Sequence, residues 1–564
     1  MKQLFSVGIF IFLLVAGINA QSVNKNEIQS AALGFIQQQD EITVNKQPGS
    51  LESQAVMLDG EEVARLVNIN DSGFVLMATD KRQKPVIGYS FRNDLDTEQM
   101  PPALKSWLKG NSQVSLQNRS EHPEWQQFLS GQKKNRSFPE VPIMLSSVWA
   151  QSWPYNAACP EHASGSHGHT LVGCVATAMG QIMNYWEYPE SGEGNATHFW
   201  GEYYTVHFDQ ANYDWTVIDD YINNYNQDEI AELNYHAAVS VNMNFGPNAS
   251  GSSISKAKDA LKDHFKYLPT LRFLNRSNYA YDEWKTMMQN EMLSNRPVLY
   301  AGVDSTTQGG HAFVMDGFRD SAYFHFNWGW GGSANGYFHL NNMASGGGNF
   351  AMNQRAVIGI MPPDASYCGD HWMTAGQYEF DDGSGYSLYK NNSACTYLIE
   401  HPDAGALKLQ FTKWSLADAG DKVTLYDGAD KNAPVLASFD GSQNPSMITS
   451  SSNKVFIEFE TNDSGIDQGW KLNYFPATTA AERNQMENLQ ILPNPADDVV
   501  YINERIDSEM ANTRVYSGDV LLNITGASIG RSSLIPEDIS RANVNQHVCI
   551  VRPSIGKIHS EFLH

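Results

Sequence analysis

The chain has 564 residues, of which 38 are lysine or arginine and 62 are aspartate or glutamate, so its formal net charge is −24. Hydrophobic residues make up 41% and charged residues 18%. This composition suits several globular domains and excludes a wholly disordered chain. Because the acidic balance repels phosphate backbones, nucleic acid is not expected as a partner.

Residues 1–20 have the pattern of a signal peptide. Lys2 supplies the positive end, an apolar run follows that is too short to span a bilayer comfortably, and Ala20 offers a small residue before a cleavage point. A membrane anchor is the alternative. No later run of about 18 uncharged apolar residues follows. We therefore expect an exported, soluble mature chain, delivered to the medium or to the cell surface.

Residues 21–138 are expected to form the first folded segment. The patterns over 63–68 and 73–78 are typical of paired strands, and residues 101–108 start like a helix with prolines at its head. The basic stretch at 133–136 suits proteolytic nicking, although an ordinary linker has the same composition.

Residues 139–362 are rich in aromatic residues and glycine. Apolar side chains at helical spacing predict a helix over residues 174–185. Strand-like runs follow at 297–303, 311–318 and 323–328.

Residues 363–476 change to short strands separated by turn signals, which predicts an all-β sandwich. The strands are expected at 407–411, 422–426, 455–459 and 471–474. Cys368 and Cys395 both lie in this segment, so we expect a disulfide between them in an oxidising compartment. The chain has five cysteines, so at least one thiol has no partner within the chain.

Cys174 has the setting of a catalytic thiol. It follows Gly173 at the start of the predicted helix, where the positive end of the helix dipole lowers a thiol pKa. The backbone N–H of Cys174 is then a natural donor to an oxyanion, and Gln151 could add a side-chain N–H. A lone cysteine at a helix start is more often a small buried apolar residue.

The base has to come from elsewhere in the chain. His311 follows two glycines at the start of a predicted strand, 137 residues after Cys174, which lies within the spacing of papain-like folds. Asn327 and Trp328 end the next strand and could orient and shield the imidazole. A glutamine, cysteine, histidine or asparagine in such a position most often has only a structural role. The order of Gln151, Cys174, His311 and Asn327 at these spacings is the more specific signal for catalysis.

Residues 139–362 resemble the streptopain family of papain-like cysteine peptidases. The matching segments are 151–156 (QSWPYN), 173–178 (GCVATA), 181–185 (QIMNY), 213–215 (YDW), 310–317 (GHAFVMDG) and 327–332 (NWGWGG). They occur in the order of the family and span the whole segment.

The resemblance implies that Cys174 is the nucleophile and His311 the general base and acid. It implies that Gln151 donates to the oxyanion and that Asn327 and Trp328 support the histidine. It also implies a substrate cleft shaped by Gly310, Gly329, Gly331 and Gly332. Residues 21–138 would be the inhibitory propeptide of the family, removed by cleavage near 133–136 or slightly later.

A metal site is the alternative for part of this region. Cys159, His162, His167, His169 and Cys174 lie within sixteen residues, and both residue types suit zinc. The spacing is not that of a standard finger, and a metal would occupy the nucleophile. We therefore expect exposed histidines, no metal and no cofactor for the peptidase.

The sandwich resembles a CUB domain through residues 367–369, 423–428 and 469–470. The resemblance implies a protein or glycan ligand. Some CUB-like modules bind calcium through acidic residues, for which Asp418 and Asp421 are the candidates, although an acidic turn is more often just solvated.

Residues 477–503 read as a linker followed by the start of a truncated sorting domain. Residues 492–502 (LPNPADDVVYI) resemble the beginning of a type IX secretion sorting domain. Residues 504–564 differ in character, because 518–530 and 543–547 resemble part of a type I restriction specificity subunit. We interpret this tail as a fusion, expect no folded domain there and assign no role to Cys549.

The predicted fold is multidomain: an α+β papain-like peptidase, an α+β propeptide and an all-β CUB-like sandwich. The predicted function is a secreted cysteine endopeptidase made as a zymogen, which acts on proteins and peptides and has its own propeptide as inhibitor. The alternatives are a catalytically inactive CUB-bearing adhesin or binding protein, and a peptidase limited to self-processing or narrow maturation.

Overall fold

The structure, a computed structural model, describes most of the chain before residue 478. The described residues are 22–39, 51–69, 73–114, 121–131, 140–303, 310–319, 322–340, 354–365, 370–374, 379–401, 404–443 and 445–477, with short strands between 490 and 551. The predicted signal peptide and the stretch 133–136 lie outside them. The chain forms two compact units, residues 1–475 and 476–564. Within the described ranges, the helices are too short or too polar to cross a membrane.

The N-terminal domain packs helices against an antiparallel sheet. Its elements are α1 (Lys25–Ile36), β1 (Ser53–Leu58), β2 (Glu61–Asn68), β3 (Phe74–Met77), β4 (Val86–Ser90), α2 (Pro102–Val114) and α3 (Glu124–Ser130). The predicted strand pair is confirmed as β2 and β3, and the predicted helix as α2. Helix α1 begins with a capping box between Asn24 and Glu27, which satisfies two N–H groups of its first turn.

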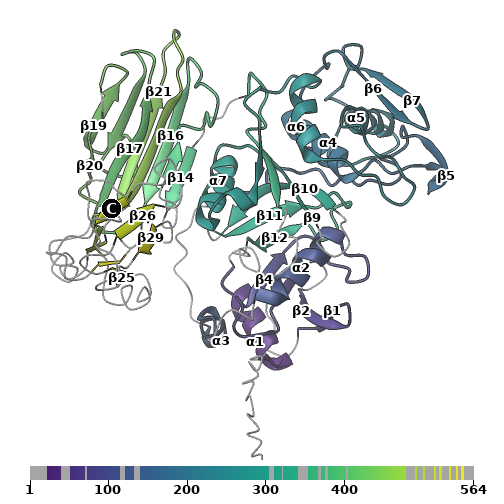
Figure 1. Ribbon diagram of the computed structural model, residues 1–564, viewed down its shortest axis with the longest axis horizontal. Helices are drawn as coiled ribbons and strands as arrows, with labels where there is room; N and C mark the ends of the chain where they lie inside the picture. The colour runs from purple at the N-terminus through teal and green to yellow at the C-terminus, as the bar shows by residue number, and fades with distance from the viewer. Residues whose placement is uncertain are drawn as a thin grey trace, which may run out of the picture. The chain divides into compact units, whose positions relative to one another are not determined.

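The central domain has a helical lobe and a sheet lobe (Figure 1). Its elements are β5 (Glu161–Ser166), α4 (Cys174–Trp186), β6 (Asn195–Trp200), β7 (Glu202–His207), α5 (Gln227–Ser240), α6 (Ile254–Asp263), β8 (Arg272–Asn275), the 3-10 helix η1 (Arg276–Asn278), α7 (Tyr281–Leu293), β9 (Val298–Val303), β10 (Gly310–Arg319), β11 (Tyr323–Asn327), β12 (Gly336–His339) and β13 (Arg355–Ile358). Helix α4 confirms the prediction for residues 174–185, and it packs on α5 and on β10. The start of α4, with Cys174, therefore lies against the sheet that contains β10 and His311.

One sheet continues from the N-terminal domain into the central domain. Its strand order is β1-β2-β3-β4-β12-β11-β10-β9-β13-β8, and β4 joins β12 through the pairs Tyr337 with Tyr89 and Phe338 with Gly88. The aromatic side chains continue the contact, because the ring of Trp107 on α2 meets the ring of Phe338 edge to face. The N-terminal domain is thus joined to the central domain by backbone hydrogen bonds and by a shared apolar core.

The third domain is the predicted two-sheet sandwich. One sheet has the order β14 (Asp370–Thr374), β16 (Ala394–Glu400), β21 (Lys454–Glu460), β18 (Lys422–Tyr426) and β19 (Val435–Asp440), and the other β15 (Glu379–Asp381), β22 (Gly469–Pro476), β17 (Leu407–Ser415) and β20 (Ile448–Thr449). Buried and half-buried residues alternate along β16 and β21, as in a strand with one face in a core. Cys395 is disulfide-bonded, as predicted. Cys368 lies outside the described residues, but β14 begins two residues later and pairs Asp370 with Thr396, next to Cys395.

The second unit contains short strands, where we expected no folded domain. They are β23 (Gln490–Ile491), β24 (Val500–Tyr501), β25 (Arg514–Val515), β26 (Val520–Asn523), β27 (Ser532–Leu534), β28 (Ala542–Asn543) and β29 (Val548–Val551). Strands β23 and β24 precede the boundary predicted at residue 503, yet they share a sheet with β25 and β28 beyond it. The strand pairing therefore crosses that boundary, because β-sheets join segments distant in sequence. The expectation that residues 504–564 form no folded domain stays a prediction.

Candidate active site

Cys174 is the first residue of α4 and is half-buried. Gly173 before it has φ 90°, a conformation that favours glycine and lets the chain turn directly into the helix. Burial by itself raises the pKa of the Cys174 thiol. The charge of His311, a hydrogen bond from its side chain and the backbone N–H groups of Ala312 and Val175 outweigh burial and hold the pKa below its usual value. The geometry thus favours a thiolate.

His311 is buried at the start of β10. Its Nε2 lies 2.8 Å from the backbone carbonyl oxygen of Trp328, which leaves Nδ1 to face Cys174. Burial by itself lowers the pKa of the imidazole. The charge of Cys174 and the hydrogen bond to it, together with the Trp328 carbonyl, raise the pKa above its usual value. The opposed shifts of the two groups favour a thiolate–imidazolium pair.

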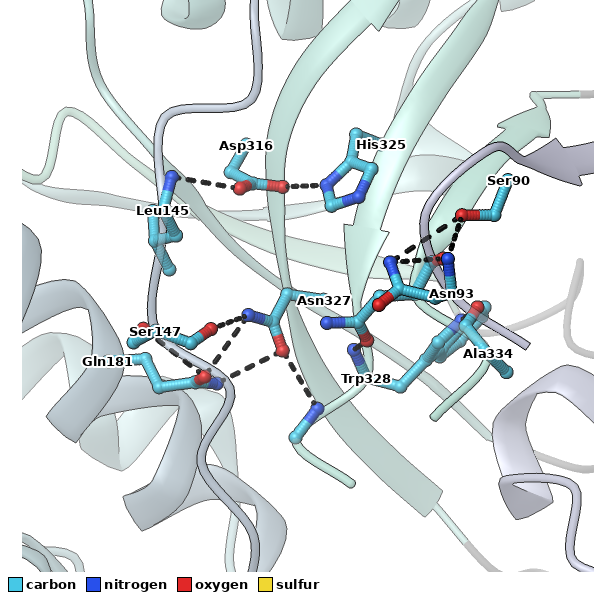
Figure 2. Close-up of polar contacts among 12 residues, drawn as sticks. Ser90, Asn93, Leu145, Ser147, Gln181, Asp316, His325, Asn327, Trp328 and Ala334 are labelled. Carbon is cyan, nitrogen blue, oxygen red and sulfur yellow. Dashed lines mark hydrogen bonds and ion pairs between the residues drawn. The ribbon is translucent and has the colours of Figure 1, made fainter. Parts of the chain in front are cut away.

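Asn327 was predicted to orient the imidazole, but its amide faces the other way. Residues that alternate along a strand point to opposite faces, and Asn327 pairs with Val314, so its side chain lies on the face of β10 opposite to that of His311. The amide donates to the carbonyl oxygen of Ser147 at 2.7 Å and accepts from the N–H of Gly329 at 3.1 Å (Figure 2). Asn327 therefore supports His311 only through the backbone of the segment that carries the Trp328 carbonyl.

Gln181 completes this arrangement and was not predicted as a site residue. It is fully buried on α4, seven residues after Cys174 and so on the same face of the helix. Its Oε1 accepts from the Trp149 N–H at 3.1 Å. The same Oε1 accepts from the Asn327 amide at 3.1 Å, and the Gln181 Nε2 lies 3.3 Å from the Asn327 oxygen (Figure 2). This amide pair connects the helix that begins at Cys174 to the strand next to that of His311. A buried glutamine inside a helical apolar pattern was the available signal.

Gln151 and the glycine-rich tract contact segments next to Cys174 in the chain or the fold. The carbonyl oxygen of Gln151 accepts from the N–H of Val172, two residues before Cys174, at 3.0 Å. The N–H of Gly331 donates to the carbonyl oxygen of Trp149 at 3.0 Å. Positive φ angles at Gly329, Gly331 and Gly332 shape this turn, and Gly310 is exposed at the start of β10.

The turn also presents Trp330, whose ring lies 6.3 Å from that of His311 between centroids. The glycine-rich turn therefore lies close to His311, and the substrate cleft expected at Gly310, Gly329, Gly331 and Gly332 stays a prediction.

The N-terminal domain contacts the turn that holds Trp328. Asn335 accepts from the Trp328 N–H at 2.9 Å, and the carbonyl oxygen of Asn335 accepts from the Asn93 side chain at 3.2 Å (Figure 2). The carbonyl oxygen of Asp94 accepts from the N–H of Ala334 at 3.0 Å. The segment after β4 therefore binds the same short turn that positions the partner of His311.

The remaining metal candidates have protein partners. His169 Nδ1 lies 2.8 Å from the carbonyl oxygen of Cys159, and the ring of His167 stacks on Trp153. In the sandwich, Asp418 accepts from the N–H of Gly420, and Asp421 is buried against Tyr389 and the N–H of Asn462.

No group of three or more His, Cys, Asp or Glu side chains within the described ranges has the geometry of a metal site.

Comparison with known proteins assigns the family. A model of the Peptidase C10 family matches residues 149–338. Streptopain of Streptococcus pyogenes (serotype M28) is 30% identical over 376 residues, which cover 60% of this chain and 92% of streptopain. The chain belongs to the Peptidase C10 family. This confirms the predicted resemblance to streptopain-like cysteine peptidases.

Other parts of this C10 chain match separate families. A Spi protease inhibitor model matches residues 20–114, and a CUB domain model matches residues 368–474. These matches confirm the predicted propeptide and CUB-like sandwich, and with them the fold class. No match shows the type IX sorting domain or the restriction-subunit tail, which stay predictions, as do the domain boundaries.

Two further relatives extend the comparison. The thiol protease/hemagglutinin PrtT of Porphyromonas gingivalis is 33% identical over 396 residues, which cover 64% of this chain. The matched region spans only 44% of that relative. The structure of a prointerpain A fragment of Prevotella intermedia is 28% identical and covers 55% of this chain and 99% of that chain, with a TM-score of 0.46.

Proposed function

We propose that this protein is an exported cysteine endopeptidase made as a zymogen, with Cys174 as nucleophile and His311 as general acid and base. The observation that carries the proposal is the pairing of the two groups: a thiol at a helix N-terminus whose pKa is lowered, against a buried imidazole whose pKa is raised. Membership of the C10 family supports the same activity.

Acylation follows from the geometry of the pair. The Cys174 thiolate attacks the carbonyl carbon of the scissile peptide bond, and the oxyanion that forms is stabilised by the backbone N–H of Cys174 and the side-chain amide of Gln151. Nε2 of His311 is fixed by the Trp328 carbonyl, so Nδ1 delivers its proton to the leaving amine nitrogen. The C–N bond breaks, the new amino terminus departs and a thioester remains on Cys174.

Deacylation uses the same groups in reverse. Neutral His311 takes a proton from a water molecule, whose oxygen attacks the thioester carbonyl. The C–S bond breaks, a carboxylic acid is released and the thiolate–imidazolium pair is restored. Of the protein groups, only Cys174 and His311 exchange bonds or protons, and the two oxyanion donors stabilise the developing charge by hydrogen bonds.

Latency is proposed to come from the N-terminal domain. Its strand β4 pairs with β12 in an antiparallel ladder. Asn93 and Asp94 bind the turn that positions Trp328. The Spi protease inhibitor match over residues 20–114 supports an inhibitory role. The disulfide of Cys395 supports an oxidising compartment and hence export.

The test is casein hydrolysis by the full-length protein after activation, with Cys174→Ala as the matched control. We expect activity in the wild type, its loss after thiol alkylation with the label on Cys174, and an inactive, unprocessed Cys174→Ala proform. A folded wild-type protein that neither cleaves casein nor takes the label at Cys174 would refute the proposal and favour a binding role for the CUB domain. Cleavage of its own propeptide without cleavage of casein would restrict the function to maturation.

A further inference from the structure

A bulge in strand β10 brings a buried aspartate and a buried histidine together. The register between β10 and β11 shifts after Met315, so Asp316 and Gly317 both lie opposite His325. Asp316 Oδ1 lies 2.6 Å from His325 Nδ1, and both side chains are buried (Figure 2). The reaction steps proposed above use neither group, so the pair needs another explanation.

The second ring nitrogen of His325 indicates where the proton of the pair lies. His325 Nε2 is buried and has no hydrogen-bond partner among the described residues. A proton on Nε2 would be buried without an acceptor, whereas a proton on Nδ1 is donated to Asp316. The ring packs edge to face on Tyr337, which restrains its plane. His325 therefore holds one carboxylate oxygen of Asp316 and leaves the other oxygen to bind elsewhere.

The other oxygen of Asp316 binds the segment that leads into the active site. Asp316 Oδ2 accepts from the N–H of Leu145 at 3.0 Å, and the Asp316 carbonyl oxygen accepts from the N–H of Met144 at 2.8 Å. Both donors belong to residues 140–149, here called the strap, which contain no helix and no strand. Because the strap has no regular backbone ladder, its N–H groups depend on contacts of this kind.

The bulge also lets the strap approach β10 closely. A Cβ on Gly317 would lie 3.0 Å from the carbonyl oxygens of Val141 and Pro142, so a larger residue would push the strap away. One residue further along, Phe318 forms an isolated bridge with Val141. The bulge, the glycine and the Asp316 carboxylate thus form one seat for the first half of the strap.

The second half of the strap ends next to the oxyanion donor. The Ser147 carbonyl accepts from Asn327, the Trp149 N–H donates to Gln181, and Gln151 follows two residues later. Along β10, Asp316 lies on the face opposite to that of His311, because side chains alternate along the strand. Asp316 is therefore connected to the site through the strap and not through the imidazole.

We propose that Asp316 and His325 are positioning residues, which hold the strap and through it the oxyanion donor Gln151 once the propeptide has been cut off. Before cleavage, the chain continues from the strap into the propeptide. Cleavage near 133–136, or slightly later, turns the strap into a chain end, and a chain end without regular structure frays unless it is tied down. The buried carboxylate is such a tie. The inference rests on the proposed peptidase activity.

The kinetic experiment uses the activated full-length enzyme and a short chromogenic peptide amide. Asp316→Asn keeps the shape of the side chain but replaces an acceptor oxygen by a donor, and His325→Phe removes the donor to Asp316. His325→Asn is the conservative variant, because its amide nitrogen is as many bonds from the backbone as Nδ1. Asp214→Asn changes an exposed carboxylate that binds the N–H of Thr216 and is the matched control.

We expect kcat to fall about ten- to a hundredfold in Asp316→Asn and His325→Phe, with KM little changed, because a misplaced oxyanion donor acts on the transition state. His325→Asn and the control should resemble the wild type. Asp316→Asn should add no further loss to Gln151→Ala, since both act through one group. No loss of kcat, a change in KM alone, a multiplicative loss in the double variant, or equal losses in His325→Asn and His325→Phe would overturn the proposal.

A second measurement tests the link to maturation without using the activity of the protein. Hydrogen exchange over residues 141–149 is followed by mass spectrometry in full-length Cys174→Ala, uncut and after limited cutting by trypsin at the basic stretch 133–136. Adding Asp316→Asn should speed exchange in the cut form and leave the uncut form unchanged. An equal effect in both forms would mean general destabilisation and would overturn the proposal. Failure of the proposed function is distinct, because the wild type would then leave the peptide amide intact.

Discussion

Replacing Asn327 by alanine tests the amide pair that joins the two lobes. The Asn327 side chain is buried, donates to the Ser147 carbonyl and the Gln181 oxygen, and accepts from the Gly329 N–H and the Gln181 amide. Each neutral hydrogen bond contributes about 1 kcal/mol net. Loss of the four bonds, with the Ser147 carbonyl and the Gly329 N–H left buried, should lower the free energy of unfolding by about 4 kcal/mol.

The measurement is the melting temperature of the peptidase transition in the Cys174→Ala background, which prevents self-digestion. For a domain of about 200 residues, 1 kcal/mol corresponds to about 2–4 °C, so Asn327→Ala should lower the melting temperature by about 8–16 °C. Asn248→Ala, at an exposed position, is the control and should leave it unchanged. Gln181→Ala should cost less in the presence of Asn327→Ala than alone, because the two residues share bonds.

The catalytic readout decides how Asn327 acts. Because its amide faces α4 and not the imidazole, activity measured well below the melting temperature should keep the wild-type pH limits. A variant that keeps the wild-type melting temperature but loses activity and shifts the alkaline limit would mean that the amide acts on His311 directly. That result would refute the reasoning from strand register.

Three further predictions concern the site. Activity should rise as pH passes the lowered pKa of Cys174 and fall as pH passes the raised pKa of His311. An NMR titration of Cys174→Ala should show a lower His311 pKa than in the wild type, because burial then acts without the thiolate charge. An unchanged His311 pKa would contradict the pairing. Mild alkylation at neutral pH should label Cys174 and spare Cys159, whose burial raises its pKa to about 12, as mass mapping would show, and equal labelling would contradict this. Gln151→Ala should lower kcat by about 10²–10³ through loss of an oxyanion donor, and a normal rate would remove Gln151 from the mechanism.

Local patterns in the sequence predicted the parts of the fold that depend on local physics. The helix that begins at Cys174 has apolar side chains at helical spacing and a glycine before it, and the strands around His311 and Asn327 are short apolar runs. These signals also placed the nucleophile and the base at the starts of their elements. The nucleophile, base and oxyanion residues could therefore be suggested from residue types and spacing, and the resemblance to the streptopain family made the assignment specific.

Contacts across the fold could not be predicted in this way. The direction of the Asn327 amide depends on the pairing of β11 with β10, and the role of Gln181 depends on how α4 packs against that sheet. His311 is hydrogen-bonded to the backbone carbonyl oxygen of Trp328. Every residue has such a carbonyl, so the residue type at position 328 could not predict this bond. The β6–β7 hairpin was missed because its exposed aromatic residues break the usual alternation of apolar and polar side chains.

The pairing of β4 with β12 has a consequence for how the enzyme is switched on. Cutting the connection after α3 breaks one covalent link but leaves the backbone bonds between the strands and the ring contacts of Trp107 and Tyr89 in place. The cut converts a tethered segment into a separate ligand, whose occupancy then follows its own concentration. The delay before full activity would then depend on how fast the freed segment is diluted outside the cell or digested. It would not depend on the rate of the first cut.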